Sequence, residues 1–114
     1  MHDQNCIFCK IISGVIPSKF IYETDLSIVL QDIAPRAPIH YLIIPKKHVQ
    51  DLSACTLEDA ALLADMMLIP ARLSAQIDDQ TAFKLIANNG YAAGQRVFHL
   101  HFHFMAGRFF QEEV

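Results

Sequence analysis

Apolar and polar residues alternate in short runs along most of the chain. Every second position is apolar through most of 97–107, and apolar runs also occupy 19–24, 27–33, 40–46 and 81–88, bounded by turn-forming residues. Runs of this length and pattern are typical of strands. The pattern therefore predicts five strands, the third of which is ended, or confined to a sheet edge, by its proline.

Two segments have apolar residues at helical spacing instead. The segment CIFCKIISG at 6–14 predicts a short amphipathic helix that ends at Gly14. A longer helix is predicted over 56–76, with its first residue, a threonine, as N-cap, Asp59 as the acid of a capping box and a kink at Pro70. Strands in succession, interrupted by one long helix, predict an α+β domain with a mainly antiparallel sheet.

Length, composition and charge limit the class of protein. A chain of 114 residues, 53% of them hydrophobic, fits one domain over 1–114. The formal charge of −3 gives no diffuse basic field, so nucleic acid is not an expected partner. The N-terminal segment lacks the features of a secretory signal, and the apolar stretch 60–71 is far shorter than the roughly 20 residues of a membrane span. We expect a cytoplasmic protein that does not associate with a membrane.

The chain contains three cysteines, and two of them, Cys6 and Cys9, have the Cys-x-x-Cys spacing. An odd number of cysteines fits reduced thiols or a metal site better than a disulfide framework. A zinc site with two cysteines and two histidines would need two imidazoles from elsewhere in the fold.

Three histidines, His99, His101 and His103, occupy alternate positions of the last predicted strand. On a strand they would share one face, while Leu100, Phe102 and Phe104 would face the core. Threonine, lysine or glutamate would serve a plain solvent-exposed face equally well. Three imidazoles on one face therefore indicate chemistry.

Two kinds of chemistry fit three aligned imidazoles. Imidazole is the commonest zinc ligand, but the first and third histidines would lie about 13 Å apart on an extended strand, so at most two could bind one ion. Alternatively, one imidazole attacks an electrophilic phosphorus or carbonyl while its neighbours orient it and protonate the leaving group. The loop upstream favours a phosphate, because it offers backbone amides, two side-chain amides and one cation, at Gly90, Gly94, Asn88, Gln95 and Arg96.

The segment HLHFHFM at 99–105 resembles the signature of the histidine triad (HIT) superfamily. Three other segments, CIFCKIISGVIPSKFIYETD, LQDIAPRAPIHYLIIPKKH and ANNGYAAGQ, are similar in order and spacing to segments of its Hint branch, the nucleoside phosphoramidase-like proteins. The resemblance covers roughly 5–108. It implies a homodimer in which two five-stranded antiparallel sheets join across a two-fold axis, with the long helix at the interface.

The composition of the long helix also predicts a homodimer. Its apolar residues cover more than the single stripe that one core requires: Leu62, Leu63, Met66, Met67, Leu68 and Ile69. The spare apolar face would pack against a second copy of the chain.

The resemblance further implies a reaction on a purine nucleotide, an AMP or GMP derivative. His101 would attack the α-phosphorus and form a nucleotidyl-histidine that water then hydrolyses, while His103 would contact the phosphate and the leaving atom. The remaining implied contacts are Asn88 and Gln95 with phosphate oxygens or in orienting the substrate, Asp32 with the ribose hydroxyls, and Phe8, Ile11, Ile16, Leu30 and Ile33 with the base. His40 also matches a family histidine near the active site.

Some HIT proteins that carry Cys-x-x-Cys complete a zinc site with the histidine of the PKKH segment and the first triad histidine. By this resemblance Cys6, Cys9, His48 and His99 would bind a structural zinc ion, which leaves His101 free for phosphorus. Reduced thiols without a metal remain the alternative at this point.

Two features depart from the Hint pattern. Arg96 stands where Hint proteins usually have a small hydroxyl residue, and the tail RFFQEEV lacks the aromatic-proline ending of many relatives. Besides a phosphoramidase, two other functions are therefore considered: a nucleotide-binding or scaffold protein with little turnover, and a zinc enzyme in which triad histidines help to activate water.

Overall fold

The structure is a computed structural model that describes residues 3–77 and 82–111. Its elements follow in the order α1 (Ile7–Ile12), β1 (Tyr22–Glu23), β2 (Ser27–Gln31), β3 (Ile39–Pro45), α2 (Ala60–Ala75), β4 (Phe83–Ile86) and β5 (Phe102–Ala106). Single 3₁₀ turns occupy Leu52–Ala54, Leu57–Asp59 and Tyr91–Ala93.

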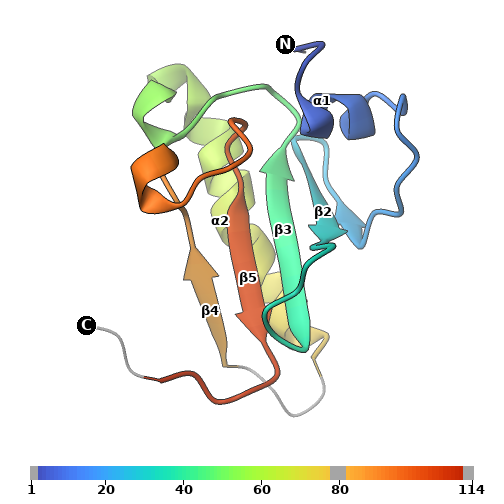
Figure 1. Ribbon diagram of the computed structural model, residues 1–114, viewed down its shortest axis with the longest axis vertical. Helices are drawn as coiled ribbons and strands as arrows, with labels where there is room; N and C mark the ends of the chain where they lie inside the picture. The colour runs from blue at the N-terminus through green and yellow to red at the C-terminus, as the bar shows by residue number, and fades with distance from the viewer. Residues whose placement is uncertain (1–2, 78–81, 112–114) are drawn as a thin grey trace.

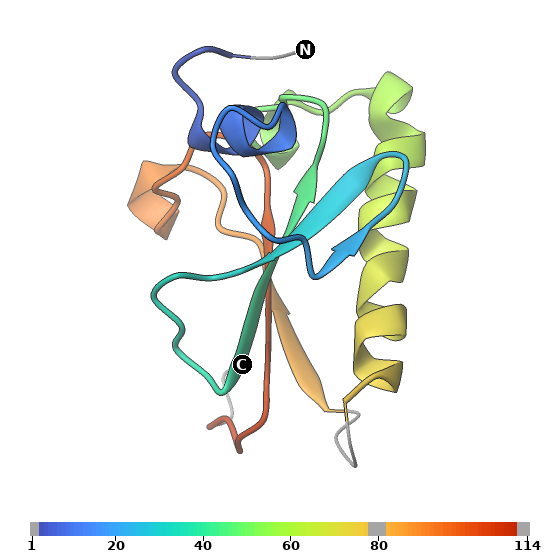
Figure 2. The same cartoon turned by 90° about the vertical axis from the view of Figure 1, so that its right-hand side faces the viewer.

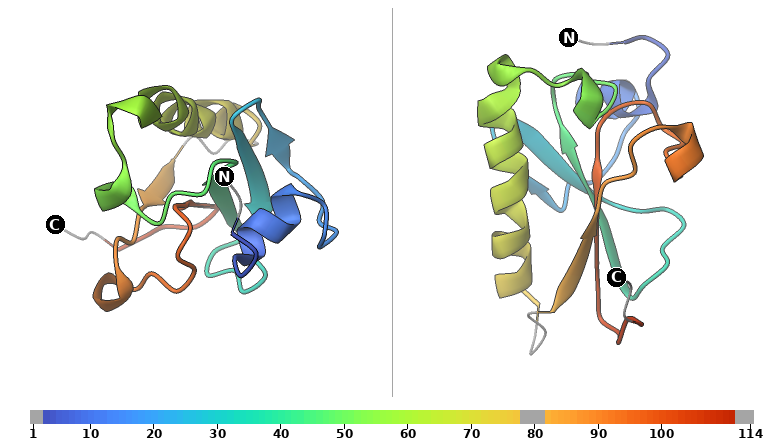
Figure 3. Two further views of the ribbon diagram at one scale, coloured as in Figure 1. Left: turned by 90° about the horizontal axis from the view of Figure 1, so that it is seen from above. Right: turned by 90° about the vertical axis from the view of Figure 1, so that its left-hand side faces the viewer.

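The strands form one antiparallel sheet in the order β1-β2-β3-β5-β4 (Figure 1). Helix α2 covers one face, and α1 lies on the opposite side near one end of the sheet (Figures 2 and 3). The predicted α+β class with a five-stranded antiparallel sheet, one long helix and one short helix is therefore confirmed.

Each face of the sheet has its own apolar cluster. Between the sheet and α2 lie Val29, Ile43, Leu62, Met66, Ile69, Leu73, Leu100, Phe102, Phe104 and Ala106. On the α1 side lie Cys6, Phe8, Cys9, Ile28, Leu30 and Ile44. Since successive strand residues point to opposite faces, burial of Phe102 and Phe104 under α2 turns His103 toward the α1 side. The predicted sidedness of this segment is confirmed.

Strand β5 is shorter than predicted. It begins at Phe102, so His99 and His101 precede the strand instead of lying on it. The backbone N–H of Leu100 donates to the carbonyl of Val49, and the His99 carbonyl lies 2.7 Å from His101 Nδ1, so neither group enters the sheet ladder. The predicted separation of about 13 Å between His99 and His103 assumed an extended strand and stays a prediction.

The other boundaries differ in detail. The predicted capping box of Thr56 and Asp59 is confirmed, but it opens a 3₁₀ turn from which α2 continues. Helix α2 is continuous from Ala60 to Ala75 with Pro70 inside it (Figure 2), and the predicted kink stays a prediction. Strands β1 and β4 are shorter than their apolar runs, and Thr81 lies outside the described residues.

Helix α1 ends as its sequence predicts. Gly14 follows the C-cap with a φ of +85°, a conformation that favours glycine. Within the described ranges, no helix is both long and apolar enough to cross a membrane.

Candidate functional site

The structure distributes the predicted site histidines over two clusters of potential metal ligands. His99 lies with Cys6, Cys9 and His48, whereas His103 lies with Asp32 and His40. The centre of the His101 ring lies 5.2 Å from the centre of the His103 ring and 5.2 Å from the centre of the Phe8 ring.

Four ligand atoms converge where α1 meets the segment before β5. Cys6 Sγ lies 3.3 Å from His99 Nδ1, and Cys9 Sγ lies 3.3 Å from His48 Nδ1 and 3.6 Å from His99 Nδ1. The two Nδ1 atoms are 3.1 Å apart. Tetrahedral zinc with sulfur and nitrogen ligands separates its ligand atoms by roughly 3.4–3.8 Å. The spacing and the donor types therefore suit one metal ion.

Hydrogen bonds around this cluster leave lone pairs of its ligand atoms available to a cation. His99 Nε2 lies 2.8 Å from the Pro45 carbonyl oxygen, which can only accept, so Nε2 carries the hydrogen and Nδ1 keeps its lone pair. The backbone N–H of Cys9 donates to Cys6 Sγ, and that of Asp3 donates to Cys9 Sγ. Burial raises the pKa of the Cys6 thiol, so metal binding here must displace a proton.

His101 has a defined ring orientation. Its Nδ1 donates to the His99 carbonyl over 2.7 Å, which leaves the lone pair of the neutral ring on Nε2. Burial lowers the pKa of His101, an effect that this hydrogen bond partly opposes. At neutral pH the ring therefore presents an uncharged nitrogen nucleophile, the form that can attack phosphorus.

His103 belongs to a second polar cluster on the same side of the sheet. Its Nδ1 lies 2.9 Å from Nε2 of His40, which is 1% exposed. Asp32 Oδ2 lies 3.3 Å from the same His40 nitrogen, and Asp32 Oδ1 accepts the backbone N–H of Ala34. Asp32 is thus held beside the two imidazoles, and a contact with ribose stays a prediction.

The buried position of His103 predicts a pH dependence of stability. Burial, aided by the neighbouring imidazoles and Arg36, lowers the pKa of His103 from 6.5 to about 4. Between these values the unfolded chain binds the proton and the folded chain does not, so this contribution is complete above pH 6.5 and is lost as the pH falls toward 4. We expect the melting temperature of His103→Gln to fall less steeply than that of the wild type over this interval. Thermal denaturation of both proteins across the interval tests this, and equal slopes would contradict it.

The loop before the histidines is held by Gln95, which is 2% exposed. Its Oε1 accepts the Gly90 N–H, and its Nε2 donates to the carbonyls of Gln50 and Val97. Asn88 donates to the Ala93 carbonyl at the turn of the same loop. Both predicted phosphate ligands therefore shape the loop, and their contact with a phosphate stays a prediction.

Arg96 turns back onto this loop. Its guanidinium carbon lies 4.0 Å from the centre of the Tyr91 ring, and Nη1 donates to the carbonyls of Tyr91 and Gln95. The residue that replaces the usual small hydroxyl is thus a stacked and exposed cation.

The residues predicted to contact the base fall into two groups. Phe8 and Leu30 are buried in the cluster under α1, and Ile11 packs against it. Ile16 is half-buried, whereas Ile33 is fully exposed. The structure therefore brings together three of the five, and base contact by any of them stays a prediction.

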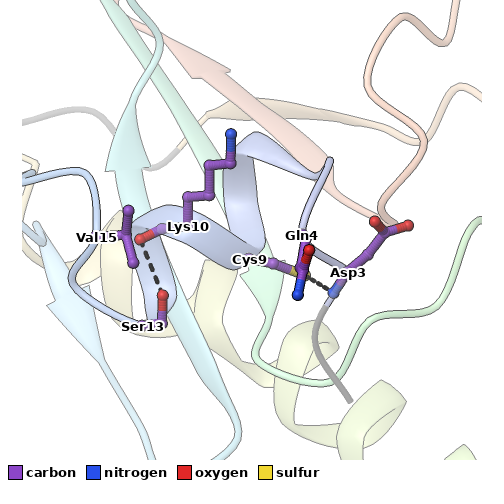
Figure 4. A pocket seen from close by; sticks show the side chains of 6 residues that line it. All are labelled: Asp3, Gln4, Cys9, Lys10, Ser13 and Val15. Carbon is purple, nitrogen blue, oxygen red and sulfur yellow. Dashed lines mark hydrogen bonds between the residues drawn. The ribbon is translucent and has the colours of Figure 1, made fainter.

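A surface hollow beside α1 is lined by Asp3, Gln4, Cys9, Lys10, Ser13 and Val15 (Figure 4). Cys6, His48 and Arg96 help to line a second hollow. Both hollows include members of the Cys/His cluster, and neither has His101 or His103 among its lining residues.

Sequence analysis missed several partners of the site. The Pro45 carbonyl and the Cys9 N–H are backbone groups, and residue type does not predict which partners such groups bind. Asp3 was missed as well, although its Oδ2 lies 3.9 Å from His48 Nε2. A carboxylate close to Cys-x-x-Cys was the one signal that could have identified it.

The fold is an antiparallel sheet backed by one long helix, with His101 directly before strand β5 and His103 on it. A family profile described as the HIT domain matches residues 13–110. The chain therefore belongs to the HIT family.

Individual relatives agree with this assignment. An uncharacterized HIT-like protein of Synechocystis sp. is 45% identical over 105 residues, which is 92% of each chain. The structure of a HIT family hydrolase from Clostridium thermocellum is 38% identical, with a TM-score of 0.91 and 98% of each chain covered. A Zn-bound histidine triad family protein from Mycobacterium smegmatis is 35% identical, with a TM-score of 0.78, over 91% of this chain and 76% of the other.

Proposed function

We propose that this protein is a Hint-like nucleotide-binding hydrolase that cleaves purine nucleoside phosphoramidates. The observation that carries the proposal is the ring of His101, whose Nδ1 is bound to the His99 carbonyl while Nε2 keeps its lone pair. The solved HIT family hydrolase from Clostridium thermocellum supports the reaction class.

In the proposed reaction, His101 Nε2 forms a bond to the α-phosphorus as the bond to the leaving amine breaks. The amine takes up a proton from water, and the later hydrolysis step returns one to the solvent. The positive charge that develops on the ring is stabilised through Nδ1–H by the His99 carbonyl. Water then attacks the nucleotidyl-histidine, which releases the nucleotide and restores the neutral ring. His103 contacts the phosphate during both steps.

The test is incubation with an adenosine phosphoramidate that carries a fluorescent amine. Release of AMP and the amine supports the proposal. Saturable binding of the substrate without release would instead favour a nucleotide-binding protein with little turnover. Loss of release on chelation at a temperature where the metal-free protein stays folded would favour the zinc enzyme.

We further propose that the Cys/His cluster binds a structural zinc ion. Two thiolates and two imidazoles with converging atoms suit zinc, and the Zn-bound relative from Mycobacterium smegmatis supports the choice of metal. When bound, the ion would tie α1 to the segment before β5. It has no part in the bond-breaking steps above.

We also propose a homodimer. In α2, Met67 and Leu68 are 56% and 61% exposed, whereas Met66 and Ile69 are buried in the core. Light scattering should give twice the monomer mass of 12.9 kDa, and the double variant Met67→Lys, Leu68→Lys should move the mass toward one chain. A wild-type mass near one chain at micromolar concentration would contradict the proposal.

A further inference from the structure

The cluster of Asp32, His40 and His103 raises a question that its distances alone do not answer. Its three candidate ligand atoms lie within 4.8 Å of one another, as a metal site would require, but the same distances fit a hydrogen-bonded chain. A metal site and a hydrogen-bonded chain require the ring hydrogen of His40 to lie on different nitrogens. A metal ligand needs a bare Nε2, whereas a hydrogen-bond donor needs Nε2–H.

A backbone amide decides between them. The N–H of Arg36 donates to His40 Nδ1 over 3.0 Å, so Nδ1 must supply a lone pair. A neutral imidazole carries one hydrogen, which therefore lies on Nε2. This excludes the neutral ring as a metal ligand through Nε2, because that nitrogen has no lone pair to give.

The assignment passes from His40 to His103. His40 Nε2 and His103 Nδ1 are 2.9 Å apart and share one hydrogen bond. Because the hydrogen is covalently bound to His40 Nε2, His40 is the donor. The carboxylate of Asp32, 3.3 Å from His40 Nε2, also accepts only and favours a hydrogen there. His103 Nδ1 is therefore an acceptor, and the hydrogen of the neutral His103 ring lies on Nε2.

We propose that His40 is a positioning residue that fixes the tautomer of His103, so that His103 presents Nε2–H to the phosphoryl oxygens. The Nε2 atoms of the two histidines then have opposite roles. His101 Nε2 is unprotonated and offers a lone pair, whereas His103 Nε2 carries a hydrogen and donates it in a hydrogen bond. The phosphate role rests on the proposed function, whereas the tautomer assignment does not.

Burial supports the neutral state on which this chain depends. Desolvation lowers the pKa of both His40 and His103, so neither ring is charged at neutral pH. A neutral Nε2–H donates a hydrogen bond without transferring its proton. His103 would thus stabilise negative charge on the phosphoryl oxygens as the bond to His101 forms.

Nitrogen-15 NMR of histidine-labelled protein tests the tautomers directly, because a protonated ring nitrogen and a bare one have distinct chemical shifts. The wild type should show His103 with hydrogen on Nε2 and His101 with hydrogen on Nδ1. A His103 signal with hydrogen on Nδ1 would overturn the proposal. This measurement needs neither a variant nor a substrate.

Two variants test the positioning role. His40→Leu removes the donor, whereas His40→Gln can place an amide N–H near the same point. In folded His40→Leu, His103 should lose its single tautomer, and kcat on the phosphoramidate should fall by about threefold to tenfold with a smaller change in KM, because only the molecules whose His103 carries hydrogen on Nε2 can still donate to the developing oxyanion. His40→Gln should recover most of both readouts.

An unchanged His103 tautomer in folded His40→Leu would overturn the role of His40, as would equal loss of kcat in both folded variants. If His40→Leu does not fold, the wild-type spectrum and His40→Gln still decide. A wild type with the assigned tautomers but no cleavage of phosphoramidate would count against the proposed function and leave the tautomer assignment standing.

Discussion

Replacing His101 by alanine should abolish nucleotide release while leaving the protein folded. The variant removes the nitrogen that would form the bond to phosphorus, and loss of a nucleophile lowers kcat on the order of a thousandfold or more. The half-buried ring makes one hydrogen bond within the described residues, to the His99 carbonyl of its own segment, so we expect the variant to keep its fold. Stopped assays of AMP release from the adenosine phosphoramidate measure the loss.

The control is His101→Gly supplied with free imidazole. Glycine leaves space for a diffusing imidazole to occupy the position of the missing ring, so release should return in proportion to added imidazole. Both variants should keep the wild-type melting temperature to within a few degrees and still bind AMP. An alanine variant that retains most of its activity would exclude His101 as the nucleophile.

Much of the fold follows from local periodicity. The alternation that buries Phe102 and Phe104 is a property of a single strand, so it could be predicted without knowledge of the rest of the chain. The capping box at Thr56 is local in the same sense, since both of its partners lie within one turn.

The start of β5 could not be predicted, because it depends on a distant carbonyl. The Val49 carbonyl accepts a hydrogen bond from the Leu100 N–H, and this contact joins segments that are about half the chain apart in sequence. His99 therefore lies before the strand, where its ring meets Cys6 at the N-terminus of α1. An apolar and polar pattern cannot reveal a backbone acceptor of this kind.

Side-chain roles are even less visible in the sequence. Gln95 reads as a phosphate ligand in a glycine-containing loop, yet its amide hydrogens bind the carbonyls of Gln50 and Val97. Ile33 reads as apolar lining but is fully exposed. In both positions the residue type is compatible with several environments, and only tertiary contacts choose between them.

Removal of zinc should destabilise the protein strongly. An ion present at a hundredfold excess over its Kd stabilises the folded state by about 2.7 kcal/mol, which corresponds to a rise in melting temperature of roughly 10–20 °C for a domain of this size. Cys6→Ser or Cys9→Ser should therefore lower the melting temperature by about this amount and lose the metal. Chelation of the wild type should have the same effect.

Cys55→Ser is the matched control for the cysteine variants. Cys55 is a half-buried thiol outside the cluster whose Sγ contacts the Asp51 carbonyl, so its replacement should leave both zinc content and the large stability term in place. Any general effect of exchanging sulfur for oxygen appears in all three variants, and only the cluster variants should also release an ion.

The two neighbouring histidines should respond to zinc in different ways. Metal analysis of carefully purified, reduced protein should find one zinc ion per chain, and His101→Ala should retain it because the His101 ring is turned to the His99 carbonyl and not to the thiols. The cysteine variants should lose more stability than kcat per folded molecule. Absence of zinc from the wild type would remove the proposed metal site. Loss of zinc from His101→Ala would show that the nucleophile and the ligand had been assigned to the wrong members of the triad.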